Sequence, residues 1–236
     1  MTLGIMQPYF LPYIGYFSLI KHCDEFILFD TPQYIRHGWI ERNRIIKRDG
    51  DPFYIKVPLN KTSQKATIDS ITINNNSDWQ AKILAQLVHY KKKAPHYDKV
   101  VALLKAIFET PVSSITELNF NALSVICDYL NIKTPIKIWS KMDLIIDEVK
   151  SPDEWALNIC KARGANSYFN PPGGRTFFNG QKYNDAGISL KFMKIEATKY
   201  TQFSNEFVPF LSIIDVLMFC SIDQIDTMLN QVNFTE

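Results

Sequence analysis

The sequence predicts an α/β fold, namely a Rossmann-like, mostly parallel sheet with covering helices. Residues 3–6 and 25–30 form two short apolar runs, each followed by a proline, as expected of buried strands. Between them, residues 12–22 carry apolar side chains at helical spacing and begin with Pro12, which suits the first turn of a helix. A strand, a helix and a strand in such a short stretch are typical of the parallel βαβ unit that opens this kind of sheet.

The later elements are predicted from the same signals. Residues 53–59 and 68–73 alternate apolar and polar side chains, which predicts two further strands. Residues 79–92, 96–109 and 115–130 each keep one apolar face and are predicted to be helices. The C-terminal part is predicted to contain strands at 136–139, 167–170 and 188–193 and helices at 155–163, 212–219 and 222–232.

Composition and charge narrow the class of protein. The chain has 236 residues, of which 46% are hydrophobic, so it is long and apolar enough to bury a sizeable core. We expect one α/β domain over residues 1–236, with residues 77–131 as a candidate helical subdomain. Lys and Arg number 26 against 24 Asp and Glu, and this formal charge of +2 favours neither nucleic acid nor an anionic membrane.

The cysteines and the apolar segments suggest a compartment. The four cysteines are far apart and include no C-x-x-C pair, which indicates a reducing, cytoplasmic location. Residues 1–8 lack the basic region and cleavage site of a secretory signal. The most apolar segment, residues 209–220, is too short to span a bilayer and contains Asp215, so we expect no membrane anchor.

A first candidate site follows the first predicted strand. Residues 7–16 contain Gln7, Tyr9 and Tyr13, and in open α/β sheets ligands gather beyond the carboxyl ends of strands, where helix N-termini offer amides to anions. This placement loosely resembles the histidine-containing signature of nucleotidylyltransferases, but Tyr13 and Tyr16 stand here and the histidines are absent. An equally good interpretation is a proline-ordered loop whose tyrosines pack the core.

Residues 30–44 form the second candidate site. Asp30 ends a predicted strand, and the segment adds Arg36, Arg42 and Arg44 near the aromatic Trp39. Guanidinium groups bind phosphate oxygens and stack on flat rings, which suits a nucleotide or a nucleotide-sugar diphosphate. A basic stretch is more commonly a solvated surface loop than a binding site. Its clustering with Asp30 at a strand end makes the binding-site interpretation more competitive.

Distinctive segments are spread along nearly the whole chain. They are residues 6–17 (MQPYFLPYIGYF), Phe29-Asp30, Gln33-Tyr34, Gly38-Trp39, residues 42–45, residues 93–95, Asn170-Pro171 with Gly173-Gly174, residues 187–190 and residues 211–219. These segments resemble the WbqC-like protein family. The resemblance implies a bacterial, cytoplasmic protein associated with O-antigen or other surface-glycan gene clusters, and it brings no catalytic assignment. Thr31 and Glu41 depart from the pattern, in which a second acid follows Asp30 and an asparagine precedes Arg42, so no role is carried over to them.

The turn at residues 170–175 is a third candidate. Asn170, Gly173, Gly174 and Arg175 would present backbone amides and a cation to an anion or to sugar hydroxyls, because the two glycines let a ligand approach the main chain. A simple Pro-Gly turn is the commoner meaning of this sequence, and the resemblance favours the functional interpretation slightly.

The histidines, the cysteines and Asp215 are the remaining candidates for chemistry. The four histidines and four cysteines have no metal-ligand spacing, so no metal site is predicted, and His37 is the candidate general base. Asp215 lies in a very apolar helix and must be paired there. One interpretation is a structural role, as an ion pair with an arginine such as one from residues 42–44 or as a helix cap. The other is that Asp215 positions that arginine for substrate.

The leading hypothesis is an enzyme of surface-polysaccharide biosynthesis that transfers an acyl or aminoacyl group to the amine of a nucleotide-activated amino sugar. His37 or Asp30 would be the base, and the predicted substrate-binding residues are Gln7, Tyr9, Tyr13, Trp39, Arg42, Asn43, Arg44, Asn170, Gly173, Gly174 and Arg175. No cofactor is firmly implied beyond an acyl or aminoacyl donor on a carrier. The expected partners are the nucleotide-linked sugar and a carrier protein.

Two alternatives stay open. One is a nucleotidylyltransferase-like enzyme that uses a nucleoside triphosphate and magnesium. The other is a non-enzymatic protein that presents exposed aromatic residues to a partner in glycan assembly. A catalyst should gather Tyr9, Arg42, Asn170 and Arg175 around one cleft, whereas an interaction protein should lack a concave pocket.

Overall fold

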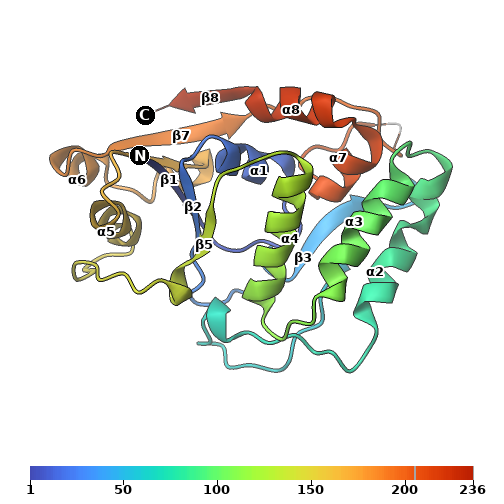
Figure 1. The fold of residues 1–236 in the computed structure, drawn as a ribbon, viewed down its shortest axis with the longest axis horizontal. Coiled ribbons are helices and arrows are strands. Elements are labelled where there is room, and N and C mark those ends of the chain that lie inside the picture. Colours follow the sequence, from blue (N-terminus) through green and yellow to red (C-terminus); the bar gives the residue numbers. More distant parts are fainter. Residues whose placement is uncertain (205, 236) are drawn as a thin grey trace.

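The computed structural model describes residues 1–204 and 206–235 and confirms the α/β class, with a six-stranded sheet between helices (Figure 1). The strand order is β5-β2-β1-β6-β7-β8, and all neighbouring pairs are parallel except β7 and β8. The chain adds strands to one side of β1 and then returns to add β6 on the other side, which makes the sheet Rossmann-like. The strands are β1 (Thr2–Met6), β2 (Glu25–Leu28), β5 (Ile136–Ile138), β6 (Ser167–Asn170), β7 (Ser189–Ile195) and β8 (Val232–Thr235).

Helices cover both faces of this sheet. One hydrophobic cluster involves α1 (Ile14–Lys21), α4 (Ile115–Tyr129), α7 (Ile213–Phe219) and α8 (Ile222–Asn230), and it extends to α2 (Trp79–Leu87) and α3 (Tyr97–Glu109). The second cluster, on the opposite face, involves α5 (Glu154–Ala162) and α6 (Gly180–Asp185). Figure 1 shows α5 and α6 on one side of β1 and β2, and α1 and α4 on the other.

The alternation of side chains along the central strands explains this division. Leu3 and Ile5 of β1 belong to the second cluster, together with Ile27 of β2, whereas Phe26 and Leu28 belong to the first. Successive residues of a strand point to opposite faces, so strands buried on both faces are apolar throughout, as predicted for residues 3–6 and 25–30.

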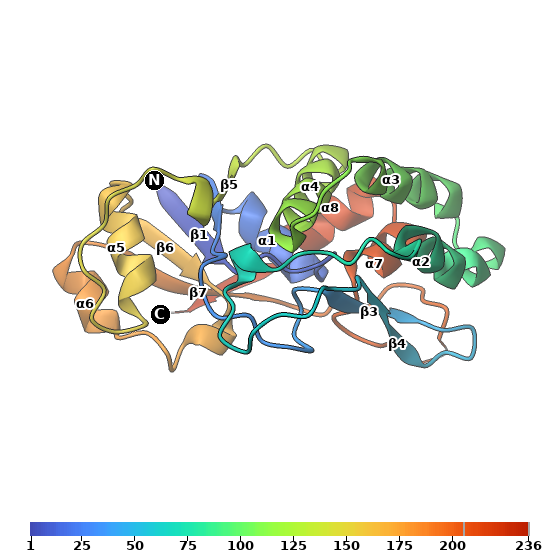
Figure 2. The same cartoon turned by 90° about the horizontal axis from the view of Figure 1, so that it is seen from below.

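A separate antiparallel hairpin, β3 (Arg42–Ile46) and β4 (Pro52–Lys56), lies outside the main sheet below α7 and α2 (Figure 2). The prediction of a strand at 68–73 was wrong, because Ile68–Ser70 forms one turn of 3-10 helix, η1. The backbone amides of Ile68, Asp69 and Ile73 bond to Pro32, Asp30 and Ser113, so this segment pairs with several others and forms no continuous ladder. The other 3-10 turns are η2 (Val88–Lys92), η3 (Trp139–Lys141) and η4 (Pro172–Gly174).

The C-terminal helix is shorter than predicted. The expected helix 222–232 ends at Asn230, and Val232–Thr235 pairs with β7 as β8, a strand that the sequence analysis missed. The helix begins with a capping box in which Ser221 and Gln224 bond each other's backbone amides. Cys127, Cys160 and Cys220 are buried. Within the described residues, no helix is both long and apolar enough to cross a bilayer.

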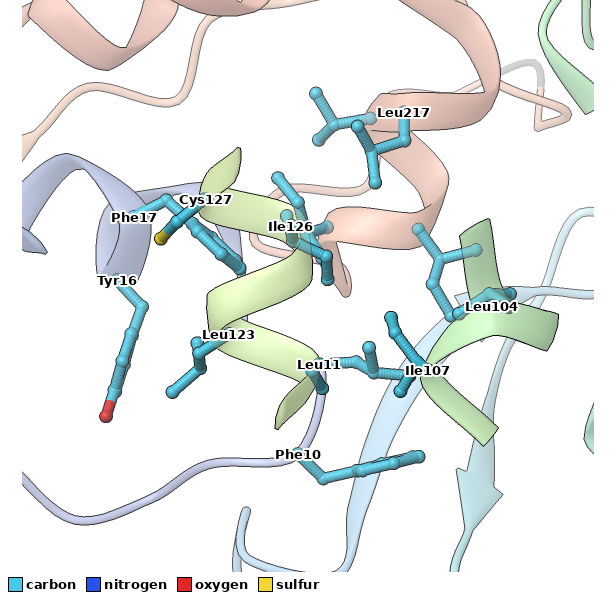
Figure 3. Packing of buried hydrophobic residues seen from close by; sticks show 14 of the residues in the cluster. Phe10, Leu11, Tyr16, Phe17, Leu104, Ile107, Leu123, Ile126, Cys127 and Leu217 are labelled. Atoms are coloured by element: carbon cyan, nitrogen blue, oxygen red, sulfur yellow. The ribbon is translucent and has the colours of Figure 1, made fainter. Parts of the chain in front are cut away.

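The loop between β1 and α1 is held by bonds to its carbonyl groups. Asn119 of α4 donates from Nδ2 to Pro8 O (2.7 Å) and to Ile40 O (2.9 Å). Asn43 of β3 donates from Nδ2 to Phe10 O (3.1 Å) and Leu11 O (3.0 Å). These bonds fix the loop while the side chains of Phe10 and Leu11 enter the core near α3 and α4 (Figure 3).

Two more bonds complete this arrangement. The hydroxyl of Tyr16 donates to Gln7 O (2.8 Å), and that of Ser212 donates to Leu11 O (2.7 Å). Leu11 itself has φ +42°, a left-handed conformation that an L-residue adopts only when its surroundings impose it. We call residues 7–12 with these donors the clamped loop.

The arginine partner predicted for Asp215 was wrong. The Asp215 carboxylate is fully buried and accepts hydrogen bonds from Tyr90 Oη (2.5 Å) and Tyr200 Oη (2.9 Å), and no arginine among the described residues pairs with it. Arg42 and Arg44 alternate along β3 with the buried Asn43 and Ile45, so the arginine side chains leave the strand on the face away from this core. Two tyrosine hydroxyls therefore solvate Asp215, and it has no role in positioning an arginine.

Replacing Asn119 with alanine is expected to cost about 2 kcal/mol or more, because two buried carbonyl groups lose their donor. Asn121→Ala, on the same helix, is the matched control: its side chain is half-buried and bonds the single carbonyl of Ile107, so a loss of about 1 kcal/mol is expected. Urea unfolding followed by circular dichroism measures both. Equal losses would contradict the special importance of the clamped loop.

Asp215 gives a pH-dependent contribution to stability. Burial raises the pKa of this carboxyl from 3.8 to about 6, although the two tyrosine hydroxyls oppose the shift. The folded protein therefore binds this proton more tightly than the unfolded chain, and the associated stability is present below the unfolded pKa and lost as pH rises through the folded one. Relative to Asp215→Asn, the free energy of unfolding of the wild type should fall by up to about 3 kcal/mol between about pH 4 and pH 7. A difference that is constant with pH would contradict this assignment.

Candidate functional site

The candidate site lies where the strand order reverses, at the carboxyl ends of β1 and β6. Open α/β sheets bind ligands at this position, because the loops that follow the two strands diverge and leave a crevice. A pocket of about 390 Å³ occupies it. Its lining combines β1 and the loop after it, the segment that follows β2, β6 and the turn after it, and the start of α5. The residues are Ile5, Met6, Gln7, Tyr9, Phe29, Thr31, Pro32, Pro152, Trp155, Ala156, Tyr168, Asn170, Phe177 and Phe178. We call it the aromatic pocket.

The aromatic pocket is uncharged. Six aromatic rings line it, and its amide side chains are those of Gln7 and Asn170. Asn170 donates from Nδ2 to Tyr168 Oη at 2.6 Å, and both side chains are buried. Burial raises the pKa of Tyr168, so its hydroxyl keeps its proton. The arrangement can hold a flat, neutral ring and offers hydrogen-bonding groups at its edge.

Gly174 explains why the turn after β6 needs a glycine. A Cβ at this position would lie 2.4 Å from Asn170 Oδ1 and 3.0 Å from the ring of Phe178. Gly173 and Arg175, by contrast, are exposed and line neither pocket described here. Within the predicted turn, Asn170 lines the aromatic pocket, and Gly174 leaves room for its side chain.

A second pocket of about 310 Å³ shares Tyr9 with the first. We call it the cationic pocket, because Arg44 of β3 and Lys194 at the end of β7 line it together with no carboxylate. Tyr13, Trp39 and Asn43, which the sequence analysis assigned to substrate binding, also line it. The other lining residues are Pro12, Pro172, Met193, Ile195 and Phe210.

The two arginines predicted to act together lie in different surroundings. Arg44 lines the cationic pocket, with its guanidinium 5.8 Å from the ring of Trp39. Arg42 stacks over Tyr54 at 4.1 Å and donates to the carbonyls of His37 and Gly38, and it lines neither pocket. Arg42 thus stabilises the loop before β3 through its bonds to two carbonyls of that loop, whereas Arg44 lines the cationic pocket.

The predicted bases also lie outside the pocket linings. Asp30 is buried, and its two oxygens accept hydrogen bonds from the amide (3.0 Å) and the hydroxyl (2.6 Å) of Ser140. Burial raises the pKa of Asp30 above its usual value, although the bonds from Ser140 oppose this shift. Its neighbours Phe29 and Thr31 both line the aromatic pocket, which places Asp30 directly behind that wall. His37 is exposed and has φ +62°.

The sequence analysis missed Trp155 and Lys194. Trp155 is the second residue of α5, and Lys194 comes just before the last residue of β7. Lys194 directly follows the predicted strand at 188–193, so the tendency of ligands to gather at strand ends is the signal that could have identified it. No comparable local signal marked Trp155. Among the described residues, no three His, Cys, Asp or Glu side chains gather as metal ligands would.

Two comparisons with known proteins found similarity over most of the chain. A Mycobacterium tuberculosis protein named "Uncharacterized protein Rv1507c" is 28% identical over 216 residues, which cover 91% of this chain and 91% of that protein. No solved structure matches the chain. The sequence profile of the WbqC-like protein family matches residues 7–227, from the first residue of the clamped loop to within α8. The chain therefore belongs to the WbqC-like protein family.

Proposed function

We propose that this protein binds a nucleotide-activated amino sugar at the carboxyl end of the sheet and transfers an acyl or aminoacyl group to the sugar amine. The observation that carries the proposal is the aromatic pocket, which lies where β1 and β6 diverge and adjoins a cationic pocket. This is the position at which sheets of this order bind nucleotides. The pocket also falls within the usual size range of small-molecule sites.

The lining of the aromatic pocket suits a nucleobase. Stacking of a base on an aromatic side chain contributes about 1–3 kcal/mol, and Tyr9, Phe29 and Trp155 offer such rings. The edge of a base carries both donors and acceptors, which match the amide groups of Gln7 and Asn170. An uncharged lining favours such a ring over an anionic or cationic group.

The transfer itself needs a group that accepts the amine proton. His37 is our first candidate, because its exposed loop before β3 also carries Trp39, which lines the cationic pocket. Asp30 is the second candidate. It is buried behind the aromatic-pocket wall formed by Phe29 and Thr31, so it could act only on an amine that enters that pocket, after exchanging a hydrogen bond from Ser140 for one to the substrate. The resemblance to proteins of surface-glycan clusters supports an amino sugar as the acceptor and a carrier-bound donor.

Titration calorimetry tests the class of ligand. UDP- and dTDP-linked amino sugars are expected to bind with micromolar or tighter affinity in the absence of a divalent metal. ATP or CTP with magnesium should bind more weakly, because no carboxylate lines either pocket to hold the metal. Binding of the triphosphates alone would favour nucleotidyl transfer, and binding of neither class would favour the non-enzymatic alternative.

Gly174→Ala is the variant that tests the aromatic pocket. The added methyl must displace the Asn170 side chain, so the affinity for the preferred nucleotide sugar should fall about tenfold or more, as expected for a lost buried hydrogen bond. Gly180→Ala is the matched control, because a Cβ there meets no atom within 4 Å. The affinity and the circular dichroism spectrum are measured for both. Identical affinities would place the ligand elsewhere.

A further inference from the structure

We propose that the cationic pocket holds the diphosphate of the nucleotide sugar, through Arg44 and Lys194 and without a divalent metal. The inference deepens the proposed function and rests on it in identifying the anion as that of a nucleotide. It assigns Lys194 as a ligand-binding residue and assigns Arg44 a different task from Arg42. The chemistry recognised is a diphosphate group.

Among the described residues, the Arg44 guanidinium forms no ion pair with a carboxylate. Its Nε is buried without a hydrogen-bond acceptor among the described residues. The ion pairs among those residues all involve other side chains, on Lys21, Lys137, Lys141, Lys161, Arg163 and Lys182. A partly buried cation without a counter-ion is unfavourable, and an anion that enters the pocket would compensate it. A buried guanidinium nitrogen without an acceptor is a stronger indication of an anion site than an exposed arginine would be.

The backbone of Arg44 is fixed on both sides. Its amide donates to Asn43 Oδ1 at 2.8 Å, and its carbonyl accepts from the amide of Ser212 at 2.8 Å. Asn43 and Ser212 also bond the carbonyl of Leu11, so Arg44 is tied to the clamped loop. The backbone that carries the cation is therefore fixed before a ligand arrives, which reduces the entropy lost on binding.

Lys194 brings a second charge from a different element. It is exposed at the end of β7, which runs parallel to β6, so its strand ends at the same edge of the sheet as Asn170. Arg44 and Lys194 line one pocket that contains no carboxylate, and two cations match the charge of a diphosphate. This pocket offers no carboxylate ligand for a metal ion, so the two side chains themselves neutralise the diphosphate.

Tyr9 sets the relation between the two pockets. Since Tyr9 lines both, one ligand can place its base in the aromatic pocket and its diphosphate in the cationic pocket. The turn after β6 has the same double role, because Asn170 lines the first pocket and Pro172 the second. The diphosphate thus lies beyond the base, with the sugar further along the same surface.

Lys194→Gln tests the inference directly, because the side chain is exposed and its replacement should not disturb folding. Inorganic pyrophosphate, UDP and uridine are titrated by calorimetry in buffer that contains EDTA. The affinities for pyrophosphate and UDP should fall about tenfold or more, as expected for the loss of a charge-assisted hydrogen bond, and that for uridine should be unchanged. Lys191→Gln removes the same charge from the same strand at a residue that lines neither pocket, and it should bind all three as the wild type does.

Each outcome separates the inference from the proposed function. If nucleotide sugars bind but Lys194→Gln and Lys191→Gln bind UDP equally well, the diphosphate site is wrong and the function stands. If pyrophosphate binds through Lys194 but no nucleotide sugar binds, the site stands and the function is wrong. Loss of UDP and pyrophosphate binding in EDTA, restored by magnesium, would overturn the metal-free site. Arg44→Lys should weaken UDP binding by at least threefold, because an ammonium cannot form the paired bonds of a guanidinium.

Discussion

The structure depends on how the carbonyl groups of residues 7–12 find donors. Two of these six residues are prolines, so the segment can form neither a helix nor a paired strand, and its carbonyls turn into the protein. Asn43, Asn119, Ser212 and Tyr16 donate to them from four different segments. An unbonded buried carbonyl would cost about 1–3 kcal/mol, so these side chains determine the path of the loop. That path brings Gln7 and Tyr9 to the pockets while Phe10 and Leu11 enter the core.

This constraint also divides the polar residues of the site by task. Asn43 lines the cationic pocket, yet its amide donors are used by the clamped loop and its oxygen by the amide of Arg44. Arg42 is likewise used within its own loop. The groups that remain for a ligand are the amides of Gln7 and Asn170 and the cations of Arg44 and Lys194. Residues that look functional in the sequence can thus have structural roles instead.

Much of the fold could be predicted from the sequence, because the signals were local. The apolar runs at 3–6 and 25–30 and the helical spacing of 12–22 reflect burial on one or both faces, and the structure confirms the unit they form. The strand expected at 68–73 failed because alternation also occurs where a segment bonds in turn to several loops. The predicted arginine partner of Asp215 was wrong because burial predicts only that the carboxylate needs a hydrogen-bond donor. Tyrosine hydroxyls 125 and 15 residues away are the donors.

The segments that form the candidate site could be predicted from local signals, but not which of their side chains line the pockets. Segments 7–16 and 30–44 could be placed near strand ends, since chain order alone fixes where a strand stops. Which side chains then face a ligand depends on contacts between distant segments, and this separated Arg44 from Arg42 and added Lys194. The central claim is that one ligand spans both pockets. A crystal structure with a bound UDP-linked amino sugar tests it most directly: the account predicts the base in the aromatic pocket and the diphosphate between Arg44 and Lys194. A nucleotide bound elsewhere, with Tyr9 untouched, would contradict it.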